Sequence, residues 1–469
     1  MTVFMAISAI TAFLLSGYVL LRIIDLKGEL GLNTGVRAAI SFSLGLGAIS
    51  LQMFLYSLAS IPFGFYSVSA PWVIIAGALL LYSIRKRPQK AASSIEKTGP
   101  GLFDVILSVV ILSQAAYALV YALALPLAGW DAWFIWFLKG RAFFVDRTVS
   151  NGFLTNGLYA YDHPEYPLLI PLSIAWVYTA IGHVSETAAK AIFPLQFYSM
   201  LAVFYYFTKR LWGRRAGLVF TALLSLTPIV LIHSGGFPVK IGVLYVGDFV
   251  GHADLTIAVY FLSACAFFYL YTQEGRTPQV ILSGLFLALG AWTKNEGLAF
   301  AALGFLGILI YLMTEKKGWW LKAAIIAAVL MLFIAPWSVY KTGLGLKSEY
   351  TGNMGLSVFF GNIGRIKLVL TRMVEYMFGY IALYNFTWWL YAASFIFNLR
   401  GLARKPLLIL NAMLLSQLAV YVLIYVISPN DINWLIQTSL DRVLLHLTPL
   451  SMLIAAVNLK EVLGENGRQ

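Results

Sequence analysis

The chain has 469 residues, of which 60% are hydrophobic and only 11% are charged, whereas roughly 25% of the residues of a soluble domain are charged. This composition excludes a soluble globular protein and indicates an all-α polytopic membrane protein. The net charge is +13, but the basic residues gather in short gaps between apolar runs, as in cytoplasmic loops. We therefore expect a multi-pass protein of the plasma (inner) membrane that has the lipid bilayer, and no nucleic acid, as a partner.

Four apolar runs open the chain, at residues 3–24, 39–60, 69–84 and 103–127. Each is near the length that crosses a bilayer, about 20 residues. The first run has no basic flank and is too long for a signal peptide, so we expect it to be a membrane span. The basic stretch "RKRPQK" (85–90) marks the cytoplasmic side, which places the N-terminus outside.

The next two apolar runs, 167–181 and 188–208, precede the basic stretch "KRLWGRR" (209–215). Two crossings would leave this basic stretch outside, against the positive-inside rule. The first run is short and contains two prolines, so we expect it to lie along the membrane as amphipathic segments do. Residues 129–187 then form one large external loop that carries juxtamembrane interfacial helices.

The remaining apolar runs alternate without conflict and bring the total to about 13 transmembrane helices, with the C-terminus cytoplasmic. We expect three parts: three N-terminal helices (1–102), a membrane module with the large loop (103–313) and a C-terminal module (314–469) with an external loop at 338–372. The single cysteine, Cys265, lies in an apolar run and is expected to be a small core residue.

The external stretch "GWDAWFIWFLKGRAFF" (129–144) combines aromatic and charged residues. Four aromatic residues repeat at i, i+3, i+4 and i+7, the spacing of one helix face: Trp130, Trp133, Phe134 and Phe137. Asp131 has two alternative roles: it caps this helix, or it presents a carboxylate where a lipid headgroup meets a water-soluble partner. Lys139 and Arg141 are expected to anchor the helix at the membrane surface.

A second polar stretch, "YDHPEYPLLIPL" (161–172), follows in the same loop. Its prolines favour an extended entry into the next helix, which presents Asp162, His163 and Glu165. A proline turn at a helix start, without further function, is the alternative.

The order of these motifs resembles that of the GT-C superfamily of polyprenyl-phosphate-sugar glycosyltransferases. The resemblance comes from an aspartate soon after a span, a His-Pro stretch before an apolar segment, and "RLWGRRAGLVFTALLSLTP" (210–228). The most similar branch is glycosyltransferase family 39, which includes protein O-mannosyltransferases and the lipid A aminoarabinose transferase. The similarity covers about residues 127–313, with a weaker match in "TSLDRVLLHLTPL" (438–450).

The resemblance implies a GT-C fold and an enzyme that transfers a sugar from a polyprenyl-phosphate donor to a hydroxyl of a lipid, glycan or protein acceptor. The reaction would take place on the extracytoplasmic face and invert the anomeric carbon. By the same resemblance Asp131 is the catalytic base, since a carboxylate can accept the proton of the attacking hydroxyl. Many relatives have a second acid next to this aspartate, where this chain has Ala132.

Two basic residues are candidates for binding the donor phosphate, where positive charge stabilises the leaving group. Lys294, in "AWTKNEGLAF" (291–300), is the first choice, and its alternative is a plain turn lysine. Arg442, in "LDRVLLH", is the second, and its alternative is an anchor to lipid headgroups. We assign Asp162, His163, Glu165, Asp254 and Glu296 to the sugar and acceptor sites.

No cofactor is expected to be required. Asp254 or Asp248, in "GDFVGHAD" (247–254), resembles the acid that some GT-C relatives use with a divalent cation. His252 and Asp254 are therefore weak candidates for a metal site, which would need more ligands than these two. His233 and His446 are expected to be structural.

Two other functions remain open. A polymerase or ligase of lipid-linked glycans would use a pyrophosphate donor and gather more basic residues around it. A lipid or solute transporter (flippase) would place charges near the bilayer midplane and pair broken helices in two halves, and the sequence has no such pairing.

Overall fold

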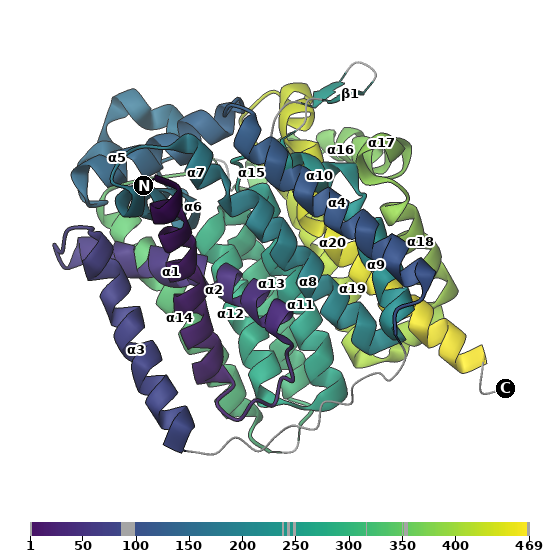
Figure 1. Ribbon diagram of the computed structural model, residues 1–469. Helices are drawn as coiled ribbons and strands as arrows, with labels where there is room; N and C mark the ends of the chain where they lie inside the picture. Colours follow the sequence, from purple (N-terminus) through teal and green to yellow (C-terminus); the bar gives the residue numbers. More distant parts are fainter. Residues whose placement is uncertain are drawn as a thin grey trace.

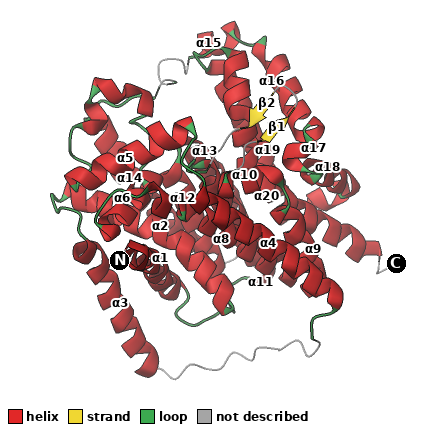
Figure 2. Cartoon of the chain, turned by 45° about the horizontal axis from the view of Figure 1, so that its top comes forward, coloured by secondary structure: helices red, strands yellow, loops and turns green. Residues whose placement is uncertain are grey.

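The computed structural model describes residues 2–85, 99–236, 239–241, 244–246, 250–315, 317–348, 350 and 355–466. Most of the basic stretch at 85–90, and the candidate Asp248, lie outside the described residues. Helices make up nearly all of the described chain, and one short hairpin of strands β1 (Val239–Ile241) and β2 (Leu244–Val246) accompanies them (Figure 2). The expected all-α polytopic class is confirmed at this level.

Ten described helices are long and apolar enough to cross a membrane. They are α1 (Thr2–Ile24), α2 (Thr34–Leu58), α3 (Phe65–Arg85), α4 (Leu102–Ala124), α8 (Ile192–Trp212), α11 (Asp254–Glu274), α13 (Asn295–Leu312), α14 (Trp319–Gly343), α19 (Lys405–Ile427) and α20 (Ile432–Asn466).

Two further helices, α9 (Arg214–Ser225) and α10 (Pro228–Gly235), meet at a bend of 66° and raise the number to eleven if they are counted as one broken span and not as a re-entrant loop. Pro228 explains the break, because proline fits the first turn of a new helix but removes a hydrogen bond inside one. The sequence predicted about 13 spans. The other two segments in that count are shorter, α12 (Thr277–Thr293) with 17 residues and α18 (Thr387–Phe397) with 11, so the number 13 stays a prediction.

The bundle is built around α11, which is buried along almost its whole length and packs against α12, α20 and α8. Helices α2 and α20 are also mostly buried, whereas α3 and α4 lie at the edge of the bundle (Figure 1). Cys265 is buried in α11, as expected of a core residue. The functional candidates on α11 and α20 therefore sit on the two helices that the rest of the protein encloses.

Close backbone contact holds α1 against α2. A side chain on Gly17 would place its Cβ 1.7 Å from the carbonyl oxygen of Ser41, and one on Gly45 would place it 1.8 Å from that of Phe13. Small residues that let helices approach in this way are typical of helix pairs in membranes.

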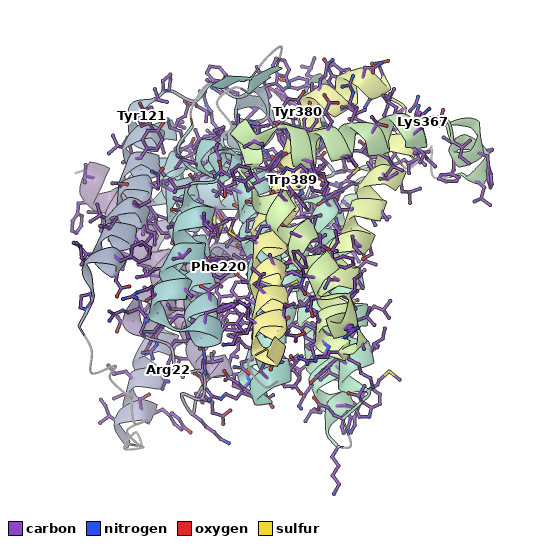
Figure 3. The ribbon with its side chains drawn as sticks, turned by 90° about the vertical axis from the view of Figure 1, so that its right-hand side faces the viewer. Arg22, Tyr121, Phe220, Lys367, Tyr380 and Trp389 are labelled. Carbon is purple, nitrogen blue, oxygen red and sulfur yellow. The ribbon has the colours of Figure 1, made fainter. Side chains whose placement is uncertain are left out.

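Short elements cluster at the upper end of the bundle as drawn in Figure 1, where the N-terminus also lies, while the C-terminus lies toward the lower end. Between α4 and α8 these elements are η1 (Ala132–Phe137), α5 (Leu138–Asp146), η2 (Phe153–Thr155), η3 (Gly157–Asp162), α6 (Leu169–Ile181) and α7 (Glu186–Lys190). Between α14 and α18 they are α15 (Leu356–Gly361), α16 (Arg365–Val374), η5 (Glu375–Gly379) and α17 (Ile381–Tyr384). Figure 3 shows α16, marked by Lys367, running across the upright helices. One further short helix, η6 (Leu399–Ala403), joins α18 to α19.

The packing of α6 corrects one expectation. An amphipathic interfacial helix leaves a polar face to water, whereas all but one of the 13 residues of α6 are buried. It packs against α5, α2 and α1, and the indole of Trp176 donates a hydrogen bond to the carbonyl of Ala9 in α1 at 3.1 Å. The apolar run at 167–181 is therefore covered by the protein itself.

Candidate functional site

A cavity of about 1600 Å³ opens among the loops at the upper end of the bundle. Its wall comes from the loop after α4, from the first turns of η1 and α13, and from α15, η5, α19 and α20. Six residues singled out from the sequence line it: Asp131, His163, His252, Lys294, Glu296 and Arg442. Three others, Asp162, Glu165 and Asp254, are buried behind the wall.

Asp131 and Arg442 form an ion pair across 311 residues of sequence. The same guanidinium lies 3.2 Å from Nδ1 of His252 and 4.0 Å from Oδ2 of Asp254. Burial alone would raise the pKa of Asp131, but the positive charges of Arg442, His252 and Lys294 outweigh it and lower the pKa to about 2. Asp131 is therefore a carboxylate at neutral pH.

Lys294 lies between two acids. Its ammonium is 3.2 Å from Oδ1 of Asp254 and 2.9 Å from Oε1 of Glu296. Lys294 lies between α12 and α13. Its two partners stand in the first turns of helices, Asp254 in α11 and Glu296 in α13, where negative charge meets the positive end of the helix dipole. This arrangement places the lysine at the cavity wall with its charge already balanced.

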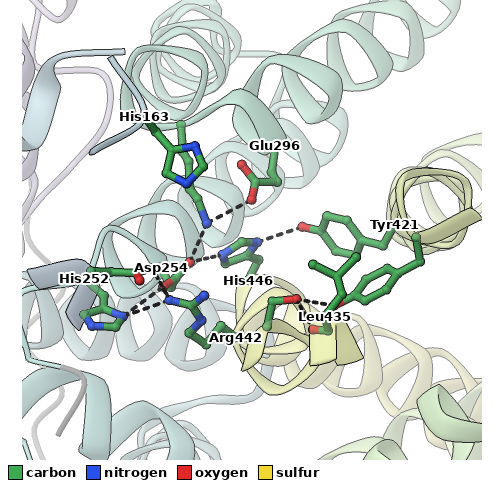
Figure 4. Close-up of polar contacts among 12 residues, drawn as sticks. His163, His252, Asp254, Glu296, Tyr421, Leu435, Arg442 and His446 are labelled. Atoms are coloured by element: carbon green, nitrogen blue, oxygen red, sulfur yellow. Dashed lines mark hydrogen bonds and ion pairs between the residues drawn. The ribbon is translucent and has the colours of Figure 1, made fainter. Parts of the chain in front are cut away.

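His446 joins this cluster, although the sequence indicated only a structural role. Its Nε2 lies 2.9 Å from Oδ1 of Asp254, and its Nδ1 lies 2.8 Å from the hydroxyl of Tyr421 (Figure 4). An ionised carboxylate only accepts hydrogen bonds, so Nε2 of His446 donates to Asp254 and Nδ1 contacts the Tyr421 hydroxyl. His446 follows Arg442 by four residues and thus shares its helix face, a spacing that could have identified it.

A second buried group corrects the expected role of Lys139. We expected a surface anchor, but the side chain is fully buried. Its ammonium donates to the backbone carbonyls of Asp162 at 2.7 Å and His163 at 2.6 Å, and lies 3.9 Å from Oδ1 of Asp162. Arg141, two residues later, is exposed as expected.

Lys139 holds the loop that carries His163. The backbone of His163 has φ 53°, a left-handed conformation that is uncommon for residues other than glycine. Its ring stacks on Tyr166 with centroids 4.7 Å apart, and Tyr166 stacks in turn on Trp136. The two carbonyl contacts of Lys139 thus fix a strained turn that places His163 at the cavity.

Burial also shifts both members of the Lys139 pair. It lowers the pKa of Lys139 to about 8, against the opposing effect of the Asp162 carboxylate. It raises the pKa of Asp162 to about 6, against the opposing effect of Lys139. The pKa values of Lys139 and Asp162 therefore lie closer to each other, and closer to neutral pH, than those of the same side chains in water.

The stretch around Asp131 differs from the regular helix that its aromatic spacing predicted. Residues Ala132–Phe137 form a π-helix, which has more residues per turn and shifts the faces. Trp130 and Trp133 remain exposed, at 65% and 49%, but Phe137 is 3% exposed. Asp131 precedes this helix and makes no capping hydrogen bond to it, so the cap is not its role here.

Within the part of the chain that the structure describes, no three His, Cys, Asp or Glu side chains are grouped so as to hold a metal ion. The two weak candidates, His252 and Asp254, face the Arg442 guanidinium instead. The use of a divalent cation stays untested.

No protein-family model, curated protein or solved structure matches the chain. The resemblance to the GT-C superfamily therefore depends on the order of its motifs.

Proposed function

We propose that the chain is an integral-membrane glycosyltransferase of the GT-C type. It transfers a sugar from a polyprenyl-phosphate donor to a hydroxyl acceptor on the extracytoplasmic face, with inversion. The observation that carries the proposal is the meeting of Asp131, Lys294 and Arg442, which come from three distant parts of the sequence, at one cavity. A carboxylate beside cations is the combination that transfer from a phosphate requires.

The lining of the cavity suits a lipid-linked donor. Part of its wall is apolar and comes from α13 and α19: Leu298, Ala299, Ala302, Leu423, Ile424 and Ile427. Its volume of about 1600 Å³ exceeds that of a typical small-molecule site, roughly 300–1,000 Å³. The cavity has room for a donor and an acceptor together.

In the proposed reaction the acceptor oxygen bonds to the anomeric carbon while the bond from that carbon to the phosphate oxygen breaks. The proton of the acceptor hydroxyl passes to Asp131, and the polyprenyl phosphate leaves as an anion stabilised by Lys294 and Arg442. Because Arg442 pairs with Asp131, a donor phosphate that attracts the guanidinium also frees the carboxylate to accept the proton.

The test is transfer of radiolabelled sugar by the purified protein in liposomes, from a panel of polyprenyl-phosphate and polyprenyl-pyrophosphate sugars, with and without a chelator. Asp131→Asn should lower the rate by about 10²-fold to 10⁴-fold, the usual contribution of a catalytic base. Asp146→Asn, at an exposed acid of α5, is the matched control and should leave the rate unchanged.

Turnover only from pyrophosphate donors would replace the proposal with a polymerase or ligase. No turnover from any donor, together with lipid or solute movement across the bilayer, would replace it with a transporter. An unchanged rate for Asp131→Asn would remove the aspartate from its assigned role.

A further inference from the structure

Helix α20 borders the cavity with two neighbouring faces. Two stripes of its side chains line the wall, Leu435, Ser439 and Arg442 on one face and Trp434, Gln437 and Asp441 on the next. Successive residues of an α-helix are about 100° apart around its axis, so the side chains of the two stripes project in directions that differ by about a quarter-turn or more. The proposed chemistry uses only the face of Arg442, which leaves the face of Asp441 without an assigned function.

Asp441 is a buried acid at the cavity wall that forms no ion pair within the described part of the chain. Asp441 is only 7% exposed. Its carboxylate accepts one hydrogen bond, from the backbone N–H of Arg442 at 2.9 Å. The guanidinium of Arg442 contacts Asp131 instead. Among the described residues no Lys, Arg or His forms an ion pair with Asp441.

A carboxylate offers about four acceptor positions, so Asp441 can accept further hydrogen bonds from the cavity side. A buried charge is costly unless such partners are supplied. The cavity position of Asp441 allows a ligand to supply them.

Several aromatic side chains lie close to Asp441. The hydroxyl of Tyr384 donates to the backbone carbonyl of Asp441 at 3.0 Å. Tyr376 and Tyr425 line the same cavity, and the Tyr425 hydroxyl is 2.7 Å from that of Ser439. An exposed amide and an exposed hydroxyl, those of Gln437 and Thr438, also line the cavity one helical turn before Asp441 on α20.

We propose that this face of α20, centred on Asp441, binds the acceptor, and that the acceptor is a saccharide. Sugar hydroxyls donate to the Asp441 carboxylate and exchange hydrogen bonds with Gln437, and the apolar side of the ring lies against Tyr376. A ligand with an ammonium group would need only the charge of Asp441. The neutral amide of Gln437 and the hydroxyl of Thr438 beside that carboxylate match a ligand with many hydroxyl groups.

This inference rests on the proposed function and adds the acceptor class to it. It also explains the order of groups along α20, because Arg442 faces the donor phosphate while the preceding residue faces the acceptor. Asp441 takes no proton in the reaction. Its role is to hold the acceptor hydroxyls while Asp131 accepts the proton of the attacking one.

Binding is measured without turnover, in the Asp131→Asn background, by saturation-transfer NMR of the protein in lipid nanodiscs. The probes are cellobiose, N-acetylchitobiose, glucosamine and a serine-containing peptide. We expect at least one neutral disaccharide to bind, and Asp441→Asn to weaken it about 10-fold to 100-fold through loss of hydrogen bonds to a charged group. Asp431→Asn, at the exposed acid that directly precedes α20 and does not line the cavity, should leave binding unchanged, because asparagine can also cap the first turn of the helix.

Asparagine keeps the shape of Asp441 and can still accept the Arg442 N–H, so the variant should fold. Gln437→Ala, at an exposed position, gives a second test that does not depend on the core and should also weaken saccharide binding. Equal saccharide binding by wild type and Asp441→Asn would overturn the subsite. Binding of glucosamine alone, or of the peptide alone, would overturn the acceptor class.

Failure of this inference is distinguishable from failure of the proposed function. Transfer from a polyprenyl-phosphate donor in the absence of any saccharide binding would overturn the subsite alone. Saccharide binding that depends on Asp441, without transfer from any donor, would support the subsite and overturn the glycosyltransferase.

Discussion

Replacing Arg442 with glutamine should raise the pKa of Asp131 and weaken sugar transfer at acid pH. In the folded protein the pKa of Asp131 is about 2, against an ordinary value of 3.8. The difference, about 1.8 pH units, corresponds to about 2.4 kcal/mol at about 1.36 kcal/mol per unit. Arg442 is the largest of the charges that oppose the burial of Asp131, so most of this energy is expected to disappear with it.

The sign of the stability effect follows from the same values. A carboxylate with a lowered pKa stabilises the folded protein above pH 3.8, and this contribution is lost as the pH falls through about 2. Without Arg442 the burial of Asp131 is no longer balanced, so protonation begins at a higher pH. The base is then lost in a pH range where the wild type still has it.

The assay is the pH dependence of kcat/KM for sugar transfer in liposomes, from about pH 4 to about pH 8. The value of kcat/KM for Arg442→Gln, divided by that for wild type, should fall as the pH is lowered. Weaker donor binding should lower this ratio further by the same factor at every pH. Arg442→Lys keeps the positive charge and should give a ratio that does not change with pH. Parallel profiles for the glutamine variant and wild type would refute the reasoning, because Arg442 would then not control the ionisation of Asp131.

Two further predictions concern stability. Lys139→Met removes the donor of two short hydrogen bonds and leaves Asp162 buried without its cation, so it should destabilise the protein by about 3–5 kcal/mol, measured by thermal unfolding in detergent. Arg141→Met, at an exposed site, is the control, and equal unfolding temperatures for the two variants would contradict the structural role of Lys139. Gly17→Val brings a side chain against the Ser41 carbonyl, within 1.7 Å at its Cβ, and should reduce the yield of folded protein, measured by size-exclusion chromatography. Gly77→Val, where no atom lies within 4 Å, should not, and an equal loss for both would argue against tight α1–α2 packing.

The sequence predicted the class of protein and several of the polar residues that line the cavity, because both depend on local features. Long apolar runs predict helices regardless of their partners, and charged residues at the ends of such runs are expensive unless they face water or each other. Lys294 stood out for this reason, whereas Asp131 and Arg442 were chosen with the help of the resemblance to the GT-C superfamily. The structure brings all three to one cavity.

The errors come from contacts that no local pattern reveals. The sequence pattern of a lysine near aromatic residues is the same whether the lysine anchors a helix at the membrane surface or is buried. The carbonyl groups that bind Lys139 lie 23 and 24 residues away in the sequence. The contact of His446 with Asp254 joins residues 192 positions apart. The π-helix after Asp131 shifts its faces in a way that the spacing of aromatic residues does not indicate.

The dispersed origin of the charged cluster has a consequence for how the protein is made. Asp131, Asp254 and Lys294 enter the membrane well before α20, which supplies both Arg442 and His446. Until α20 is in place, Asp131 lacks its guanidinium partner and Asp254 has Lys294 but not the imidazole of His446, and an unpaired charge is costly near a bilayer unless it faces water. Placement of α20 and the pairing of Asp131 with Arg442 are thus one event, so a copy in which α20 is misplaced leaves the Asp131 carboxylate without its guanidinium partner.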